Sequence, residues 1–125
     1  MIGYEAGLND EHEFSENQSL TTLQRYAAAF GLDRATGIEL SEGTPHISDV
    51  NAVPSYIGQG NHLYSTSQLA RYVTALATSG TVYNLSLLDK VTDSQGQTLE
   101  TYEPSVDSEM SDVPENVWAD IHDGM

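Results

Sequence analysis

Residues 65–80 read STSQLARYVTALATSG and hold a start signal, an apolar face and a stop signal for one helix. Ser65 and Gln68 have the spacing of a capping box, in which the serine side chain accepts from the amide of Gln68 and the glutamine side chain reaches back. Gly80 is placed to end the helix. Because apolar residues recur between these signals at steps of three, four and seven, we expect this helix at the centre of the core. Its apolar positions are Leu69, Tyr72, Val73 and Leu76.

A second helical pattern lies upstream, over residues 20–30. Apolar residues are spaced there by three and four positions, and Gly31 follows as a stop signal. Residues 1–7 look like the tail of a helix that runs into an exposed polar loop. The apolar positions of the 20–30 helix are Leu20, Leu23, Ala27 and Phe30.

The stretch between the two helices, residues 32–61, has six glycines and prolines among mostly polar residues and shows no sustained periodicity. It predicts irregular chain with short turns. A structureless stretch of this length is unusual in a compact domain, and it usually belongs to a site or packs against another part of a protein.

Downstream, residues 86–92 and 97–103 are rich in strand-forming side chains and are separated by a polar turn. This pattern predicts a β-hairpin with Gly96 at a positive φ. Residues 105–112 are predicted to be an acidic linker.

The chain is expected to end in a further helix, for which Asp112 supplies the cap and Pro114 lies in the first turn. Its apolar face is predicted to consist of Val117, Trp118 and Ile121. The pattern as a whole indicates a mainly α fold with a small β-hairpin.

Composition limits the function. The 125 residues suit one domain with a thin core, because only 38% of them are hydrophobic. The formal net charge of −15 repels nucleic acid phosphates and anionic lipid headgroups, so neither nucleic acid nor direct membrane contact is expected. No stretch approaches the roughly 18 apolar residues of a membrane span. The acidity fits either a solvated surface or a patch that meets a basic partner.

The chain lacks the patterns of known catalytic and metal sites. It has no cysteine, and its four histidines, His12, His46, His62 and His122, are scattered without the spacing of metal ligands. The only lysine, Lys90, does not follow a phosphate-binding loop, and the residue three positions before it is Leu87 and not a serine. We therefore expect no catalytic residue, no metal and no cofactor in this chain.

Two features leave alternatives open. Gly58, Gln59 and Gly60 let backbone amides approach a ligand or a neighbouring chain closely, or they form a plain tight turn. Arg71 either orients a loop through a bidentate bond to a carboxylate or is an ordinary exposed cation on its helix.

Short motifs run along nearly the whole chain in a consistent order: residues 26–32 with YA and FGL, TGIEL at 36–40, IGQG at 57–60, SQLARY at 67–72, SGT at 79–81, residues 85–91, and residues 117–125 with VW and GM. Together they resemble the transpeptidase domain of class B penicillin-binding proteins. Each motif is short, and it is their combined order and spacing that carries the resemblance.

In that family the enzyme acylates itself on the serine of a Ser-x-x-Lys motif, helped by Ser-x-Asn and Lys-Thr/Ser-Gly motifs along the cleft. None of these can be carried over to this chain. Ser15, Glu16 and Asn17 do spell Ser-x-Asn, but the family places that motif just before the counterpart of residues 2–5, so we interpret them as loop. The resemblance implies that the chain lies between the second and third motifs and is inactive alone.

The resemblance further implies that residues 1–125 are a partial domain, the helical subdomain of the penicillin-binding protein and serine β-lactamase-like transpeptidase fold. Gly58, Gln59 and Gly60 would then form a structural turn near the cleft. The parent protein would be anchored in the bacterial cytoplasmic membrane, with this segment on the extracytoplasmic side. It would cross-link peptidoglycan stem peptides and bind β-lactams.

The remainder of the transpeptidase domain is the expected partner of this chain. Without it, the helix over residues 69–76 and Trp118 are expected to expose apolar surface and to promote self-association. The alternative is a stand-alone acidic helical interaction module.

Overall fold

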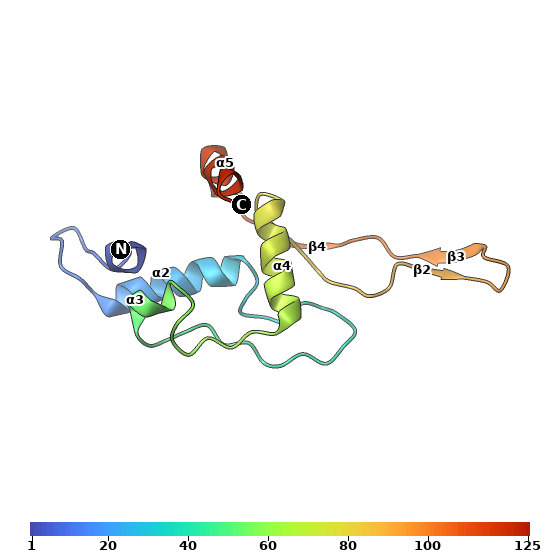
Figure 1. The fold of residues 1–125 in the computed structure, drawn as a ribbon, viewed down its shortest axis with the longest axis horizontal. Helices are drawn as coiled ribbons and strands as arrows, with labels where there is room; N and C mark the ends of the chain where they lie inside the picture. The colour runs from blue at the N-terminus through green and yellow to red at the C-terminus, as the bar shows by residue number, and fades with distance from the viewer.

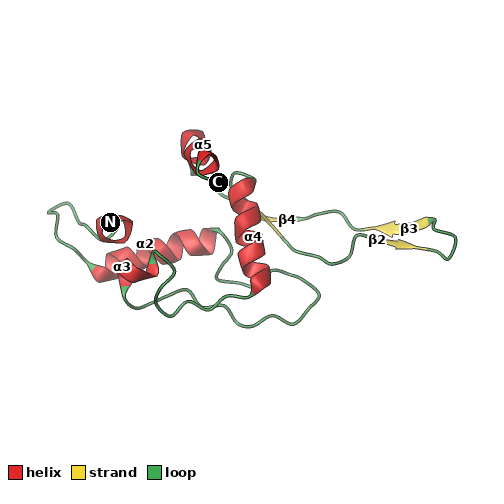
Figure 2. Ribbon diagram, viewed as in Figure 1, coloured by secondary structure: helices red, strands yellow, loops and turns green.

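The computed structural model describes all 125 residues and contains five helices and two two-stranded antiparallel sheets (Figures 1 and 2). The helices are α1 (Ile2–Glu5), α2 (Glu16–Ala29), α3 (Ala52–Ser55), α4 (Thr66–Ala77) and α5 (Glu115–Asp123). One sheet pairs β1 (Thr81–Tyr83) with β4 (Val106–Glu109), and the other pairs β2 (Lys90–Thr92) with β3 (Thr98–Thr101).

The elements are spread along one long axis. Helices α1, α2 and α3 gather at one end, α4 crosses near the middle, and the β2–β3 hairpin projects at the other end (Figure 1). The chain exposes 8349 Å² of surface and buries only 18 residues. A folded monomer of this mass exposes about 6,600 Å² by the usual scaling, so this chain is much less compact than an independent domain. No helix combines the length and apolar character needed to cross a membrane.

Helix α4 begins and ends as predicted. The Ser65 hydroxyl accepts from the amide of Gln68 at 3.2 Å, and the Ser65 amide donates to the Gln68 side chain at 2.8 Å, so both bonds of the capping box are present. Gly80 follows the helix with a φ of 96°.

The buried face of α4 differs from the prediction. Its buried residues are Gln68, Arg71 and Ala75, whereas Leu69 and Val73 are 47% and 52% exposed. The expectation that these two side chains lie in the core is therefore wrong. The polar groups of Gln68 and Arg71 reach backbone carbonyls of residues 31–35, and this bonding determines which face turns inward.

Helix α2 begins four residues earlier than predicted. Ser15 is its cap and accepts from the amide of Gln18 at 3.4 Å, so Ser15, Glu16 and Asn17 start a helix and are not a loop. The negative charge of Glu16 in the first turn is favourable to the helix dipole. Gly31 follows the helix with a φ of 76°, as its position predicted.

Residues 32–61 are mostly irregular, as predicted, and contain one helical turn, α3. The β2–β3 hairpin is also confirmed, with shorter strands than predicted and with Gly96 at a φ of 84°. The side chain of Asp93 orders its turn by accepting from the amides of Gln95 and Gln97, each at 2.8 Å.

The β1–β4 sheet was not predicted, because the predicted linker at 105–112 contains β4. In this sheet Thr81 lies opposite Glu109, and Val82 lies opposite Ser108. Val82 of β1 is fully buried. No local pattern marks β4 as a strand, because β4 is polar and β1, the strand it pairs with, lies more than twenty residues earlier in the sequence.

Helix α5 is present, but Asp112 does not cap it. Pro114 occupies the cap position without a side-chain bond, and its φ of −61° suits a helix start. Trp118 is 5% exposed and packs edge-on to Phe30 and directly beside Gly80. The expectation that Trp118 is an exposed apolar residue is therefore wrong.

Candidate functional site

An apolar groove of about 580 Å³ lies where α2, α4 and the turn after α3 meet. Most of the residues that line it are hydrophobic, and Tyr26, Phe30 and Tyr72 supply aromatic surface. Phe30 packs edge-on against Tyr72 with their ring centroids 5.1 Å apart, which joins the two helices at this groove. Leu23, Ala27, Leu32, Ser55, Gly58, His62, Tyr64 and Leu69 complete the lining.

The turn formed by Gly58, Gln59 and Gly60 borders this groove. Gly58 and Gly60 have φ values of 81° and 113°, a region that L side chains rarely adopt, and all three residues are exposed. A Cβ on Gly60 would lie 2.6 Å from the hydroxyls of Ser48 and Ser55, while a Cβ on Gly58 would meet nothing. Gly60 is thus required for close packing, and Gly58 for backbone conformation alone.

Two buried serines hold the turn from beneath. Their hydroxyls are 2.7 Å apart, and the carbonyl oxygen of Val50 lies 3.1 Å from the Ser48 hydroxyl and 2.9 Å from the Ser55 hydroxyl. The single proton of Ser48 can also reach Oδ1 of Asn61, 2.8 Å away, and Nδ2 of Asn61 donates to the Asp49 carboxylate. The hydrogen bond from Asn61 is the main cause that lowers the pKa of Asp49. No sequence motif predicts this network, because its members are ordinary polar residues spread over the irregular stretch.

His62 joins three segments of the same loop. Its Nδ1 accepts from the amide of Ser48 at 3.1 Å and lies 2.7 Å from the Tyr64 hydroxyl, while its Nε2 lies 3.1 Å from the carbonyl of Ser55. These contacts assign the proton of the neutral ring to Nε2. Burial raises the pKa of Tyr64. Because the ring bonds backbone atoms and Tyr64, and not the hydroxyl of Ser48 or Ser55, this group has no geometry for activating a serine.

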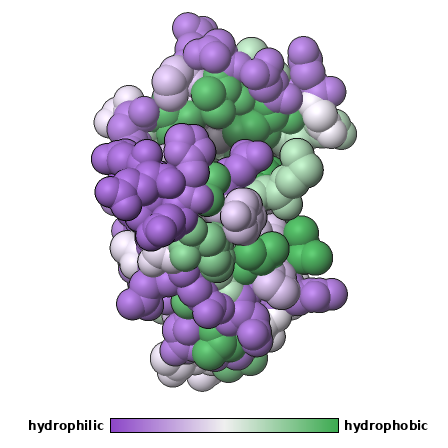
Figure 3. All heavy atoms as spheres, turned by 90° about the vertical axis from the view of Figure 1, so that its left-hand side faces the viewer, coloured by the Kyte–Doolittle hydropathy of each residue, from purple (hydrophilic) through white to green (hydrophobic).

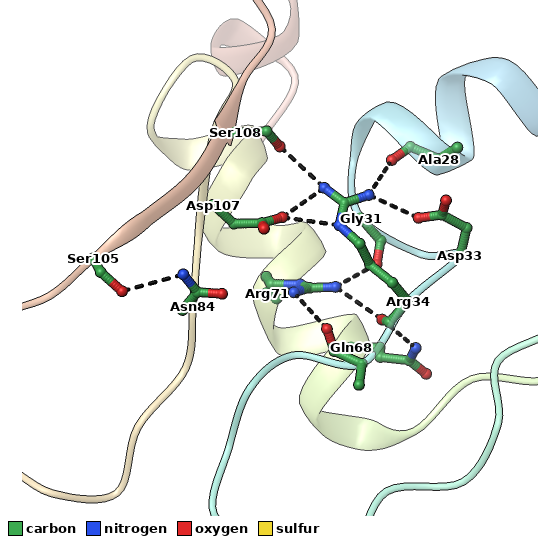
Figure 4. Close-up of polar contacts among 11 residues, drawn as sticks. Ala28, Gly31, Asp33, Arg34, Gln68, Arg71, Asn84, Ser105, Asp107 and Ser108 are labelled. Atoms are coloured by element: carbon green, nitrogen blue, oxygen red, sulfur yellow. Dashed lines mark hydrogen bonds and ion pairs between the residues drawn. The ribbon is translucent and has the colours of Figure 1, made fainter.

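Arg71 lies at the junction of α4 and the segment after α2 (Figure 4). Its guanidinium donates to the carbonyls of Gly31, Arg34 and Ala35, and the side chain is 1% exposed. Burial, together with the nearby charge of Arg34, lowers its pKa. Both interpretations left open by the sequence, a carboxylate bond and an exposed cation, are therefore wrong, since Arg71 binds backbone carbonyls.

Arg34 lies beside the Arg71 guanidinium and connects the segment after α2 to β4 (Figure 4). It donates to Asp107, to Asp33, to the carbonyl of Ala28 and to Ser108. Desolvation opposes its charge, but the bonds to the two aspartates outweigh this and raise its pKa. The two arginines thus hold the end of α2, the middle of α4 and β4 in one arrangement.

The Glu42 carboxylate anchors the start of α4. One of its oxygens accepts from the amide and hydroxyl of Thr36 at 2.7 and 2.9 Å, and the other accepts from the hydroxyls of Ser65 and Ser67. Desolvation alone would raise its pKa, but the bonds from Ser67, Thr36 and Ser65 outweigh it and lower the pKa.

These hydrogen-bond networks hold the loops and α4 in place relative to one another. The structure brings together no group of three or more acidic or histidine side chains that could hold a metal ion. Lys90 lies on the exposed hairpin, opposite Thr101. Apolar residues appear among hydrophilic ones at the surface of the end that carries α1 and α3 (Figure 3). The structure therefore offers apolar surfaces held by buried polar networks.

Comparison with known proteins identifies the relatives of this fold. The family model described as penicillin binding protein transpeptidase domain matches residues 12–125. Two solved structures of penicillin-binding protein 2B from Streptococcus pneumoniae are similar, each at 22% identity. The protein of strain 5204 covers 85% of this chain with a TM-score of 0.67, and that of strain R6 covers 86% with a TM-score of 0.70. This chain spans 19% of each. No match was found among curated proteins.

Proposed function

Since the chain belongs to the penicillin-binding protein transpeptidase domain family, we propose that residues 1–125 are a partial transpeptidase domain that forms a structural wall of its active-site cleft. In this proposal they are the helical subdomain, and the catalytic motifs lie elsewhere in the parent protein. The turn at Gly58, Gln59 and Gly60 lies near the cleft and shapes its border.

The observation that carries this proposal is the exposed face of α4. Leu69 and Val73 are about half exposed, and every exposed residue of the helix is uncharged in a chain with 19 acidic residues. A helix that lacks charge on its outward face is normally covered on that side as well. The large exposed surface of the whole chain supports the same conclusion. The exposed residues are Thr66, Leu69, Ala70, Val73, Thr74 and Ala77.

The parent is proposed to be a class B D,D-transpeptidase that cross-links peptidoglycan stem peptides and is acylated by β-lactams. Its proposed location is the extracytoplasmic side of the bacterial cytoplasmic membrane, where it is anchored by a segment outside residues 1–125. This chain contributes no catalytic residue. Its buried networks around Arg71 and Glu42 keep α4 and the groove in fixed positions against the remaining domain.

The alternative, a stand-alone acidic interaction module, is supported by the net charge but not by the packing. Such a module would have to be stable with 18 buried residues and an uncovered apolar face. It would also have no reason to match the transpeptidase model over residues 12–125.

A fluorescent penicillin distinguishes the two functions. The full-length protein and the purified 125-residue chain are incubated with the reagent and separated under denaturing conditions. The proposal requires covalent label on the full-length protein and none on the chain alone. Unlabelled full-length protein, or label on residues 1–125, would reject it.

A further inference from the structure

The β2–β3 hairpin projects from the body as an arm (Figure 1). Every residue of both strands is exposed, and the two strands form a separate sheet with no third strand on either side. Its base is nevertheless held firmly, because the Glu39 carboxylate accepts from the Leu87 amide at 2.9 Å and from the Ser86 hydroxyl at 2.6 Å. Those bonds lower the pKa of Glu39. The arm is therefore fixed at its base and ordered at its turn by Asp93.

One face of the arm combines apolar and acidic side chains. Val91 and Glu100 are opposite each other in the register, so their side chains leave the same face. Tyr102 is two residues beyond Glu100 and therefore lies on that face too. The Glu100 carboxylate raises the pKa of Tyr102, mainly through a hydrogen bond with the tyrosine hydroxyl and secondly through its negative charge. Asp89 continues the face, since its carbonyl accepts from the Tyr102 amide at 2.8 Å.

The carboxylates on this face distinguish it from the face of α4. The uncharged face of α4 can be buried inside a domain at no electrostatic cost, whereas burying Asp89 and Glu100 without cations is costly. No arginine or lysine of this chain is placed to neutralise them. Arg34 pairs with Asp107, and Arg71 donates to backbone carbonyls. Arg25 stacks on the Tyr26 ring. Lys90 is opposite Thr101 in the register and so lies on the other face of the hairpin. Whatever covers this face must bring its own positive charge.

The edges of the arm are poorly suited to pairing with another strand. Leu99 has no partner in the register and forms a bulge in β3, and β2 carries Lys90. A bulge and a lysine on an edge strand both discourage the pairing of a further strand. A second copy is opposed by the net charge of −15. Interfaces between separate proteins have a core enriched in aromatic residues and a polar rim, and this face offers an aromatic and an aliphatic side chain accompanied by two carboxylates.

We propose that the face formed by Asp89, Val91, Glu100 and Tyr102 is a docking surface for a separate protein, whose matching surface presents lysine or arginine beside an apolar side chain. Val91 and the Tyr102 ring supply the apolar centre, and the two carboxylates set the orientation of the partner. This inference does not depend on the parent being a transpeptidase, because it uses only the geometry of the arm.

Site-specific photo-cross-linking in the native bacterium tests the proposal. A benzophenone side chain is placed at Val91 of the full-length protein, and at Thr101, on the opposite face, as the matched control. We expect a cross-link from position 91 to a different protein, through a peptide that contains lysine or arginine, and little from position 101. Adding Glu100→Lys should lower the yield about fivefold, the effect of one lost exposed ion pair.

Glu11→Lys makes the same charge change in a remote exposed loop and should leave the yield unchanged. Labelling by fluorescent penicillin, or native circular dichroism if the protein is not labelled, checks that each variant is folded. The proposal is overturned by a cross-link within the same molecule or to a second copy, by equal yields from both positions, by insensitivity to Glu100→Lys, or by no cross-link at all.

Discussion

Arg34 donates from both Nε and Nη2 to one carboxylate oxygen of Asp107, at 2.9 and 2.5 Å, across 73 residues of sequence. The pair ties the segment after α2 to β4, and the carbonyl of Arg34 accepts from Arg71 at 3.0 Å. Both members are partly exposed, so the pair itself contributes only about 1 kcal/mol. Its main consequence is positional, since it holds the backbone carbonyls that receive the buried Arg71.

Arg71→Met should destabilise the fold strongly. The carbonyls of Gly31 and Ala35 would lose the Arg71 donor in a site that excludes water, and the carbonyl of Arg34 would keep only Gln68. We expect a loss of about 3 kcal/mol in the free energy of unfolding. Urea denaturation of the protein measures it. Arg25→Met, which removes an exposed arginine, is the matched control and should change stability by less than about 1 kcal/mol. Equal effects of the two substitutions would contradict the structural role of Arg71.

The two glycines of the turn should differ in their tolerance of alanine. Gly58→Ala meets open space and costs only its strained φ, about 1 kcal/mol. Gly60→Ala adds a clash with the hydroxyls of Ser48 and Ser55 and should cost about 3 kcal/mol. Thermal unfolding of the two variants, compared with the parent sequence, gives both values. A Gly60 variant as stable as the Gly58 variant would show that the serines do not pack against the turn.

Glu42 should make stability depend on pH in the acidic range. Its pKa is lowered in the folded state, so its contribution is fully present above its ordinary value of 4.5 and is lost as the pH falls through the lower folded value. Glu42→Gln should therefore reduce stability at pH 7 and lessen the fall in stability below pH 4.5. Denaturation midpoints measured at a series of pH values test this. An unchanged pH profile in the variant would exclude Glu42 as a contributor.

Val73→Gln should have opposite consequences in two settings. In the 125-residue chain it replaces an exposed side chain and should change stability by less than about 0.5 kcal/mol. In the complete domain, where we propose that Val73 is covered, it should cost about 2 kcal/mol. Val91→Gln on the hairpin is the control, and purified samples of both should tolerate it. If Val73→Gln is harmless in the complete domain, the proposed cover over α4 is absent.

Local signals explain how much of this fold could be predicted. The capping box of α4 and the turn at Gly96 depend on residues a few positions apart, and both were predicted correctly. The buried face of α4 could not be predicted, because Gln68 and Arg71 turn inward only to reach carbonyls some 35 residues away. The β1–β4 sheet could not be predicted for the same reason, because its two strands are distant in the sequence. Similarly, the positive φ of Gly58 and Gly60 follows from glycine itself, but the network of Ser48 and His62 beneath them depends on distant contacts.

The most direct test of the central claim is hydroxyl-radical footprinting of α4 in the 125-residue chain and in the full-length protein. We predict that Leu69 and Val73 are modified readily in the chain and are strongly protected in the full-length protein, because the remaining transpeptidase domain covers them. Val53, which is 39% exposed on α3, provides an internal reference for reactivity within the chain. Equal modification of Leu69 and Val73 in the two samples would contradict the account, since α4 would then face solvent in the complete protein.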